Sequence, residues 1–93
     1  MRIDVTNAEP EVIARMADLS GLRVLEVGGG EGRMTAMLAE VAERVVSIDT
    51  DAEAVAMARS AVRSPNVEFS VADICTMEPR PSTVDAVVLA LSL

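Results

Sequence analysis

The residues that point most directly to chemistry are the glycines at positions 28–32, where the sequence is Gly-Gly-Gly-Glu-Gly. A compact apolar run at residues 22–27 comes directly before them, and an amphipathic helical pattern follows. A strand that runs into a glycine-rich turn and then a helix is typical of nucleotide-binding sites. The N–H groups and positive dipole at the helix start face the ligand, and glycine lets the backbone approach it. The cluster is therefore a candidate ligand-binding loop.

The spacing of these glycines narrows the choice of ligand. A dinucleotide signature has the form G-x-G-x-x-G. Started at Gly28, it places Arg33 in the third glycine position, and started at Gly30 it places Thr35 there. Neither register fits. The pattern that the sequence does contain is Glu26-x-Gly28-x-Gly30-x-Gly32.

The residue types that are missing exclude several reaction classes. The chain has no His, Lys, Trp or Tyr, and its only cysteine is Cys75. Histidine triads and Schiff-base lysines are thereby excluded, and a zinc ion has no plausible ligand set, so no metal site is expected. No general base stands out, so the catalytic residues stay unknown at this point. The net charge of −7 disfavours nucleic-acid binding by this segment alone, because phosphate neutralisation needs a basic stripe.

Strand patterns alternate with helical ones along the chain. Four strands are expected, within residues 22–27, 45–49, 67–71 and 84–91. A short helix is expected after Asn7, and a second carries the stripe Met34, Met37, Leu38 and Val41. A third is expected to begin near Asp51, because Thr50 and Glu53 have capping-box spacing. This alternation predicts an α/β fold: a Rossmann-like, three-layer parallel sheet with flanking helices.

The ordered motifs resemble those of the class I S-adenosylmethionine-dependent methyltransferases. The first motif of that family is similar to Val24-Leu25-Glu26-Val27-Gly28-Gly29-Gly30-Glu31-Gly32. An acidic residue ends the family's second strand, as Asp49 does here, and another follows the third strand, as in Ala72-Asp73-Ile74. The fourth strand commonly opens with an aspartate, as in Asp85-Ala86-Val87-Val88-Leu89. These motifs cover nearly the whole chain in the right order.

The resemblance implies a cofactor, S-adenosylmethionine, and a role for each matching residue. Asp49 would accept hydrogen bonds from both ribose hydroxyls, and Glu26 would order the loop and the cationic amino end of the ligand. Asp73 would bind the adenine amino group, with the Ile74 backbone N–H on a ring nitrogen. Thr50 stands where the family often has a larger apolar side chain against the adenine. The loop glycines that would run against the ribose and methionine parts are Gly28, Gly30 and Gly32.

Each of these residues also has a purely structural interpretation. The glycines could form only a tight turn, Asp49 could flank a helix cap, and Asp73 could be an ordinary loop residue. Glu26, at a strand end, could be solvated. Two other functions stay open as well. One is a methyltransferase-like module that binds a ligand or a protein partner without turnover, and the other is a nicotinamide-nucleotide domain.

The resemblance also implies that the chain is one partial domain, residues 1–93, with the strand order 3-2-1-4. In the seven-stranded family fold, later strands cover the fourth strand, so we expect an open edge there. Self-association or a partner chain could cover such an edge. The substrate-recognition half is missing, so the methyl acceptor is unidentified. No membrane span or signal peptide is visible, and we expect a cytoplasmic protein.

Overall fold

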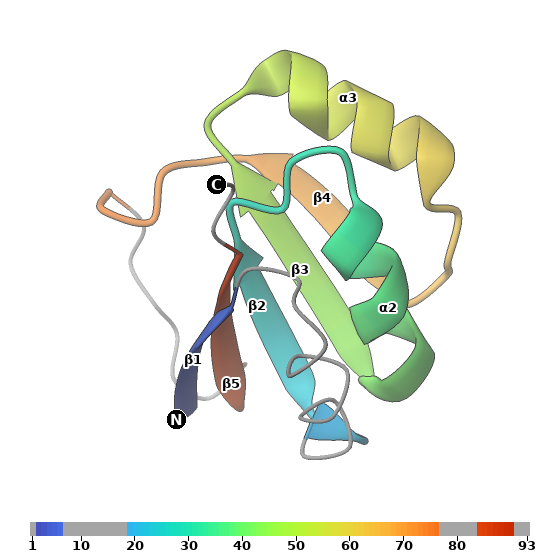
Figure 1. The fold of residues 1–93 in the computed structure, drawn as a ribbon, viewed down its shortest axis with the longest axis vertical. Coiled ribbons are helices and arrows are strands. Elements are labelled where there is room, and N and C mark those ends of the chain that lie inside the picture. The colour runs from blue at the N-terminus through green and yellow to red at the C-terminus, as the bar shows by residue number, and fades with distance from the viewer. Residues whose placement is uncertain (1, 7–18, 77–83, 91–93) are drawn as a thin grey trace.

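The described residues of the chain form a five-stranded sheet in which every pair of neighbouring strands is parallel. The computed structural model describes residues 2–6, 19–76 and 84–90. The strand order is β1-β5-β2-β3-β4 (Figure 1). The bounds are β1 Arg2–Thr6, β2 Arg23–Val27, β3 Arg44–Asp49, β4 Val67–Val71 and β5 Ala86–Ala90.

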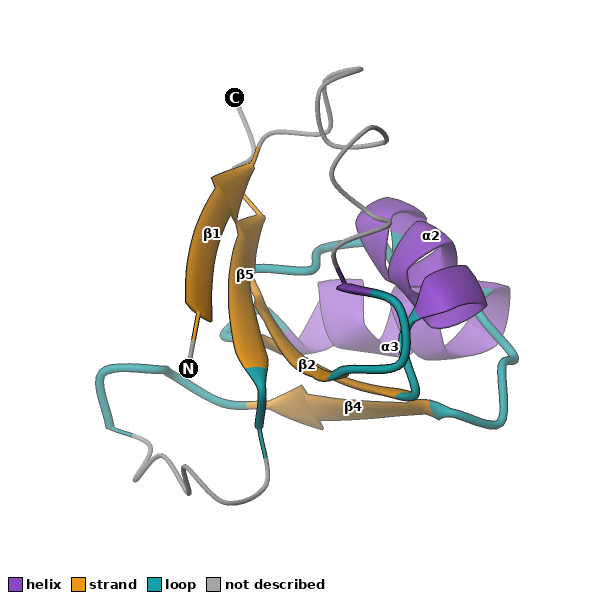
Figure 2. Cartoon of the chain, turned by 90° about the horizontal axis from the view of Figure 1, so that it is seen from below, coloured by secondary structure: helices purple, strands orange, loops and turns teal. Residues whose placement is uncertain are grey.

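Two described helices connect the central strands. Helix α2 (Arg33–Val41) joins β2 to β3, and α3 (Ala52–Ala61) joins β3 to β4. Both connections step the same way across the sheet, and right-handed crossovers then place both helices on one face (Figure 2). The predicted helix after Asn7 lies outside the described residues. Among those that are described, no helix is long and apolar enough to cross a membrane.

The predicted strand order 3-2-1-4 is confirmed as β4-β3-β2-β5, but the expected open edge at β5 is wrong. Strand β1 pairs in parallel with β5, in a register that sets Ile3 opposite Val87 and Val5 opposite Leu89. The segment Arg-Ile-Asp-Val-Thr alternates polar and apolar residues, which is a strand pattern. Self-association through an open β5 edge therefore loses its structural basis.

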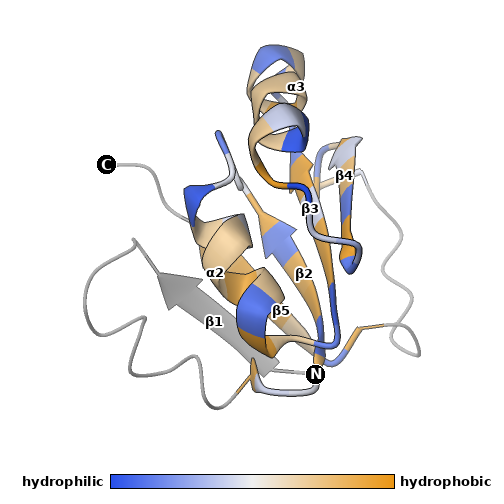
Figure 3. Cartoon of the chain, turned by 90° about the vertical axis from the view of Figure 1, so that its right-hand side faces the viewer, coloured by the Kyte–Doolittle hydropathy of each residue, from blue (hydrophilic) through white to orange (hydrophobic). Residues whose placement is uncertain are grey.

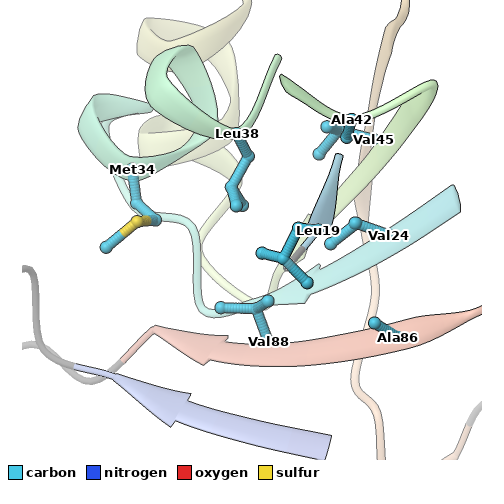
Figure 4. Packing of buried hydrophobic residues seen from close by; sticks show 8 residues of the cluster. All are labelled: Leu19, Val24, Met34, Leu38, Ala42, Val45, Ala86 and Val88. Carbon is cyan, nitrogen blue, oxygen red and sulfur yellow. The ribbon is translucent and has the colours of Figure 1, made fainter. Parts of the chain in front are cut away.

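The main core lies between α2 and the sheet. Met34 and Leu38 of α2 are buried against the sheet, and Leu38 is 1% exposed. The predicted helical stripe is confirmed, with Met37 and Val41 packed at its margin. Figure 4 shows side chains of this cluster meeting between the elements. Its buried members are Leu19, Val24, Met34, Leu38, Ala42, Val45, Ala86 and Val88.

The other face of the same strands carries a second apolar cluster. Leu25, Ile48 and Val87 are its buried members, and Ala72 and Ile74 pack beside them. Successive side chains of a strand point to opposite faces, so these residues alternate with those facing α2. The central strands are thus apolar on both faces, as expected of a parallel sheet.

An ion pair joins β2 to β5 at the end of the sheet away from the glycine loop. The backbone N–H of Arg23 donates to Oδ2 of Asp85 at 2.8 Å, and its Nε donates to the same oxygen at 3.1 Å. Nη2 of Arg23 donates to Oδ1 at 3.2 Å. These hydrogen bonds hold the pKa of Asp85 below its ordinary value. The aspartate that opens the fourth predicted strand therefore has a structural role.

Asn66 closes the carboxyl end of α2. Its Nδ2 donates to the carbonyl oxygens of Ala39 and Ala42 at 2.9 and 3.1 Å. Replacing it with Asp removes this donor and places an acceptor beside two carbonyl groups. We expect Asn66→Asp to lower the free energy of unfolding by about 1–3 kcal/mol, measured by urea denaturation. The exposed Glu53→Gln variant should change it by less than about 0.5 kcal/mol.

Candidate functional site

The predicted site residues lie at one edge of the sheet. Parallel strands bring their carboxyl ends together, so the segments after β2, β3 and β4 meet there. The glycine loop 28–32 follows β2, Asp49 ends β3, and a turn at residues 72–76 follows β4. Hydrogen bonds tie this edge together: Gly28 N–H donates to the carbonyl of Ile48 at 2.9 Å, and Ala72 N–H to that of Asp49 at 3.0 Å.

Gly32 lets the two helices come close at the end of the loop. It is the N-cap residue of α2 and has φ of 94°, a conformation that side chains other than glycine rarely adopt. A Cβ atom there would lie 2.9 Å from Cγ2 of Val62 and 3.1 Å from Cβ of Ala58. The glycine thus serves both the turn and the packing of the loop against α3.

The carboxylate of Asp49 joins the glycine loop to the segment that begins α3. Its Oδ2 accepts a hydrogen bond from the N–H of Gly30 at 2.9 Å. Its Oδ1 accepts one from the N–H of Asp51, also at 2.9 Å. An ionised carboxylate has about four acceptor positions, so each oxygen can accept a further donor. The side chain is only partly buried, which leaves it within reach of a ligand.

Glu26 is fully buried beneath the loop, so its interpretation as a solvated strand end is wrong. It is 0% exposed, and Figure 3 shows the hydrophilic colour interrupting the apolar strand β2 near its carboxyl end. Its Oε1 accepts hydrogen bonds from the hydroxyl of Thr35 and, at 2.8 Å, from that of Ser47. Its Oε2 is also buried and has no hydrogen-bond partner among the described residues.

The pKa of Glu26 is raised from its ordinary value. Burial is the main cause, because it disfavours the charged form, and the negative charge of Asp49 acts in the same direction. The hydrogen bonds from Thr35 and Ser47 oppose this rise, since they stabilise the carboxylate. Among the described residues, no basic side chain contributes to this shift in the pKa of Glu26. Glu26 therefore keeps its proton to a higher pH than an ordinary glutamate does.

The start of α3 lies one residue from where the capping-box spacing places it. The N-cap residue is Asp51, whose Oδ1 accepts hydrogen bonds from the N–H groups of Glu53 and Ala54 at 3.0 and 3.3 Å. The helix does begin beside Asp51, as predicted. Thr50 is exposed and is not the cap. Aspartate is at least as strong an N-cap residue as threonine, which accounts for the shift.

Asp73 and Ile74 lie in the turn after β4. The Oδ1 of Asp73 accepts a hydrogen bond from the N–H of Cys75 at 2.8 Å, and its carbonyl accepts one from the N–H of Thr76 at 3.0 Å. Asp73 is exposed, whereas Ile74 packs at the second apolar cluster. The carboxylate of Asp73 thus supports its own turn and remains accessible.

Thr35 and Ser47 belong to the site but do not follow from the motifs. Both are buried, Thr35 at 0% and Ser47 at 4% exposure, and their hydroxyl oxygens lie 3.4 Å apart. The available signal is a polar residue at a core-facing position. Ser47 lies two residues after the buried Val45 and therefore on the same face of β3, and Thr35 adjoins the buried Met34 on α2. A buried hydroxyl needs a partner, and here the partner is Glu26.

Gly29 leaves no room for a side chain above this buried group. A Cβ atom there would overlap the Ser47 hydroxyl oxygen and lie 2.8 Å from Oε1 of Glu26. We expect Gly29→Ala to lower the free energy of unfolding by about 1–3 kcal/mol, because the hydroxyls and the loop must move apart. Urea denaturation measures this loss. Ala39→Gly, which removes one methyl group in α2, is the reference for a change in backbone freedom. A urea midpoint of Gly29→Ala equal to that of the wild type would contradict the close packing of Gly29 on Ser47 and Glu26.

The raised pKa of Glu26 also predicts a pH dependence of stability. Between the unfolded-state pKa, about 4.3, and the higher folded-state value, the folded chain retains a proton that the unfolded chain releases. The stabilisation from this group is therefore complete below the unfolded-state pKa and is lost as the pH rises through the folded-state pKa. Glu26→Gln does not titrate, so its free energy of unfolding relative to wild type should increase with pH over this interval. A difference between Glu26→Gln and wild type that stays constant over this interval would contradict the shift.

Comparison with known proteins shows which family the chain resembles. A sequence model described as a methyltransferase domain matches residues 24–93. The chain is 36% identical over 93 residues to protein-L-isoaspartate O-methyltransferase 1 of a Polaromonas species, covering 92% of this chain and 39% of that protein. It is 40% identical over 76 residues to an rRNA adenine N-6-methyltransferase of Saccharopolyspora erythraea, covering 76% of this chain and 20% of that protein.

A solved structure shares both fold and sequence with the chain. This is an RNA methyltransferase from Salinibacter ruber in complex with S-adenosyl-L-homocysteine, with a TM-score of 0.74 and 26% identity. The alignment covers 92% of this chain and 61% of that one. The chain thus spans well under half of the two curated relatives and less than two thirds of the solved structure. The resemblance noted in the sequence is confirmed: this chain belongs to the methyltransferase domain family.

Proposed function

We propose that the chain binds S-adenosylmethionine and forms the cofactor-binding part of a methyltransferase whose methyl acceptor is not identified. The observation that carries the proposal is the position of Asp49. Its carboxylate ends β3 at the carboxyl edge of a parallel sheet and is hydrogen-bonded to the N–H of Gly30. A ligand with a vicinal diol and a flanking polar chain can bind the carboxylate and the loop together.

The residues present fit the parts of this cofactor. Asp49 has acceptor positions left for two ribose hydroxyls, since each oxygen accepts one hydrogen bond in the structure. A Cβ atom on Gly30 would meet nothing within 4 Å, so that side of the loop is open. Gly28, Gly30 and Gly32 would run against the ribose and methionine portions. Beneath them, Glu26 would favour the cationic amino end.

The adenine end would be held by the turn after β4. We assign Asp73 to the adenine amino group and the backbone N–H of Ile74 to a ring nitrogen. Asp73 is exposed, and one of its carboxylate oxygens already supports the turn. Thr50, which is exposed beside Asp49, would form the wall against the base. These assignments follow the motif positions and the shared edge of the sheet.

The chemistry suits a chain with few reactive side chains. When bound, the cofactor supplies a methyl group already activated on a sulfonium. The residues of this chain would then hold and orient the ligand, and orientation is a large part of the rate gain in such displacements. The relatives named above act on different acceptors by their names, which is why the acceptor is left open. The cytoplasmic location expected from the sequence stays a prediction.

Calorimetric titration tests the proposal. S-adenosylmethionine and its demethylated product should both bind, and NAD should give no heat. We expect Asp49→Asn to weaken cofactor binding by about ten- to a hundredfold, because it removes the charge from hydrogen bonds worth about 1.5–3 kcal/mol. Glu53→Gln removes one negative charge from the first turn of α3 and serves as the matched control, with affinity close to wild type.

The stability of each variant is measured alongside its affinity. Asp49 also holds the glycine loop through Gly30, so Asp49→Asn can lower the midpoint of unfolding as well as the affinity. The two losses are therefore measured separately. Binding of NAD by the folded chain, with no binding of either methyltransferase ligand, would overturn the proposal. Binding of S-adenosylmethionine without methyl transfer to any acceptor tested would favour a non-catalytic module.

A further inference from the structure

The two oxygens of the Glu26 carboxyl group lie in different environments. Oε1 accepts hydrogen bonds from both Thr35 and Ser47. Oε2 is buried and has no hydrogen-bond partner among the described residues. A buried carboxylate oxygen without a donor is costly, and the cost is smaller when the group is neutral. Since Oε1 serves as the acceptor, a proton on Glu26 belongs on Oε2.

The groups facing Glu26 provide no compensating positive charge. Thr35 faces it from α2 and Ser47 from β3, and Val88 is opposite it in β5. Asp49, at the end of β3, is negatively charged and disfavours ionisation. Arg33 at the start of α2 is exposed and is not among the groups that act on Glu26. A cation would therefore have to come from outside the described part of the chain.

The glycine loop separates Glu26 from the open side of the site by one layer of backbone. Gly29 lies directly over Oε1, where even a Cβ atom would be too close at 2.8 Å. Gly30, the next residue, faces open space. A charged group seated on the loop would thus act on the carboxyl group over a short distance through a medium of low dielectric constant.

We propose that a ligand ammonium group seated on the glycine loop expels the Oε2 proton of Glu26 to solvent, so that cofactor affinity depends on pH. The inference rests on the proposed function and adds its regulation by protons. The positive ligand favours the ionised carboxylate, and the ionised carboxylate favours the ligand by the same free energy. Affinity rises with pH while Glu26 is neutral in the free chain and ionised in the complex, by up to about tenfold per pH unit for one proton.

Thr35 and Ser47 act as positioning residues in this coupling. Their hydroxyl groups donate to the same oxygen and stabilise the carboxylate, which keeps its ionisation within reach of a ligand. Removing one donor favours the neutral form. The rise in affinity then moves to higher pH, an effect that a merely structural role for the hydroxyl would not produce.

The experiment is titration calorimetry of the chain with S-adenosylhomocysteine, which keeps the ammonium group. The pH is varied between about 5.5 and 7, below the pKa of about 8 of an α-amino group. At each pH, two buffers with different ionisation enthalpies report the protons released. We expect release of up to one proton per ligand and an affinity that increases with pH. Methylthioadenosine has no ammonium group, so its affinity and heat should show neither effect.

Variants assign the proton to Glu26. Glu26→Gln should bind S-adenosylhomocysteine with an affinity that does not change with pH, because the side chain at position 26 then has no proton to release. Ser47→Ala should move the rise in affinity to higher pH than in the wild type. Ser60→Ala, the same change at an exposed hydroxyl of α3 that bonds Ala56, should leave the profile in place. Thermal unfolding of each variant shows that it is folded during the titration.

The outcomes separate this inference from the proposed function. If both ligands bind but the affinity for S-adenosylhomocysteine is flat and its heat is the same in both buffers, the coupling is wrong and the cofactor site stands. The same holds if Glu26→Gln keeps the wild-type slope, or if Ser47→Ala and Ser60→Ala have the same profile. If neither ligand binds to the folded chain, both proposals fall together.

Discussion

The site depends above all on the bridge that Asp49 forms across the carboxyl edge of the sheet. A parallel sheet brings the ends of its strands to one edge, but it does not fix the loops that follow them. Asp49 fixes two of these loops, because its oxygens accept hydrogen bonds from Gly30 and Asp51. Its carbonyl accepts a third from Ala72 after β4. One residue thereby links the segments after β2, β3 and β4, and its side chain keeps acceptor capacity for a ligand.

Two acidic side chains near this edge have opposite environments. Asp49 is partly buried, and each of its carboxylate oxygens accepts a hydrogen bond from a backbone N–H group. Glu26 is fully buried and has only hydroxyl donors, both on the same oxygen. Thr35 and Ser47 can donate to Oε1 whether or not Oε2 carries a proton, whereas an arginine partner would fix the charge. This arrangement holds the loop from below without committing the carboxyl group to one charge.

Sequence reasoning was most successful where the pattern is repeated and local. The four predicted strands and the α2 stripe follow from hydrophobic periods, which many residues determine together, and the strand order follows from the resemblance to the family. The N-cap of α3 was displaced by one residue because Thr50 and Asp51 are both able to cap, and only three-dimensional context chooses between them. The pairing of β1 with β5 is non-local, since it joins Ile3 to Val87, and no local pattern specifies such a partner. The hydroxyls of Thr35 and Ser47 became recognisable once their shared contact with Glu26 was visible.

The two curated relatives align with most of this chain but differ in the acceptors that their names give. A protein-L-isoaspartate methyltransferase and an rRNA adenine methyltransferase, by their names, modify chemically different acceptors. Both nevertheless align with most of this chain, at 92% and 76% coverage, while it spans only 39% and 20% of their lengths. Most of this chain therefore aligns with proteins whose names give different acceptors. The bridge of Asp49, the glycine loop and the buried Glu26 all fall within residues 24–93, which match the methyltransferase domain model, and the cofactor-binding role proposed for these residues requires no particular acceptor.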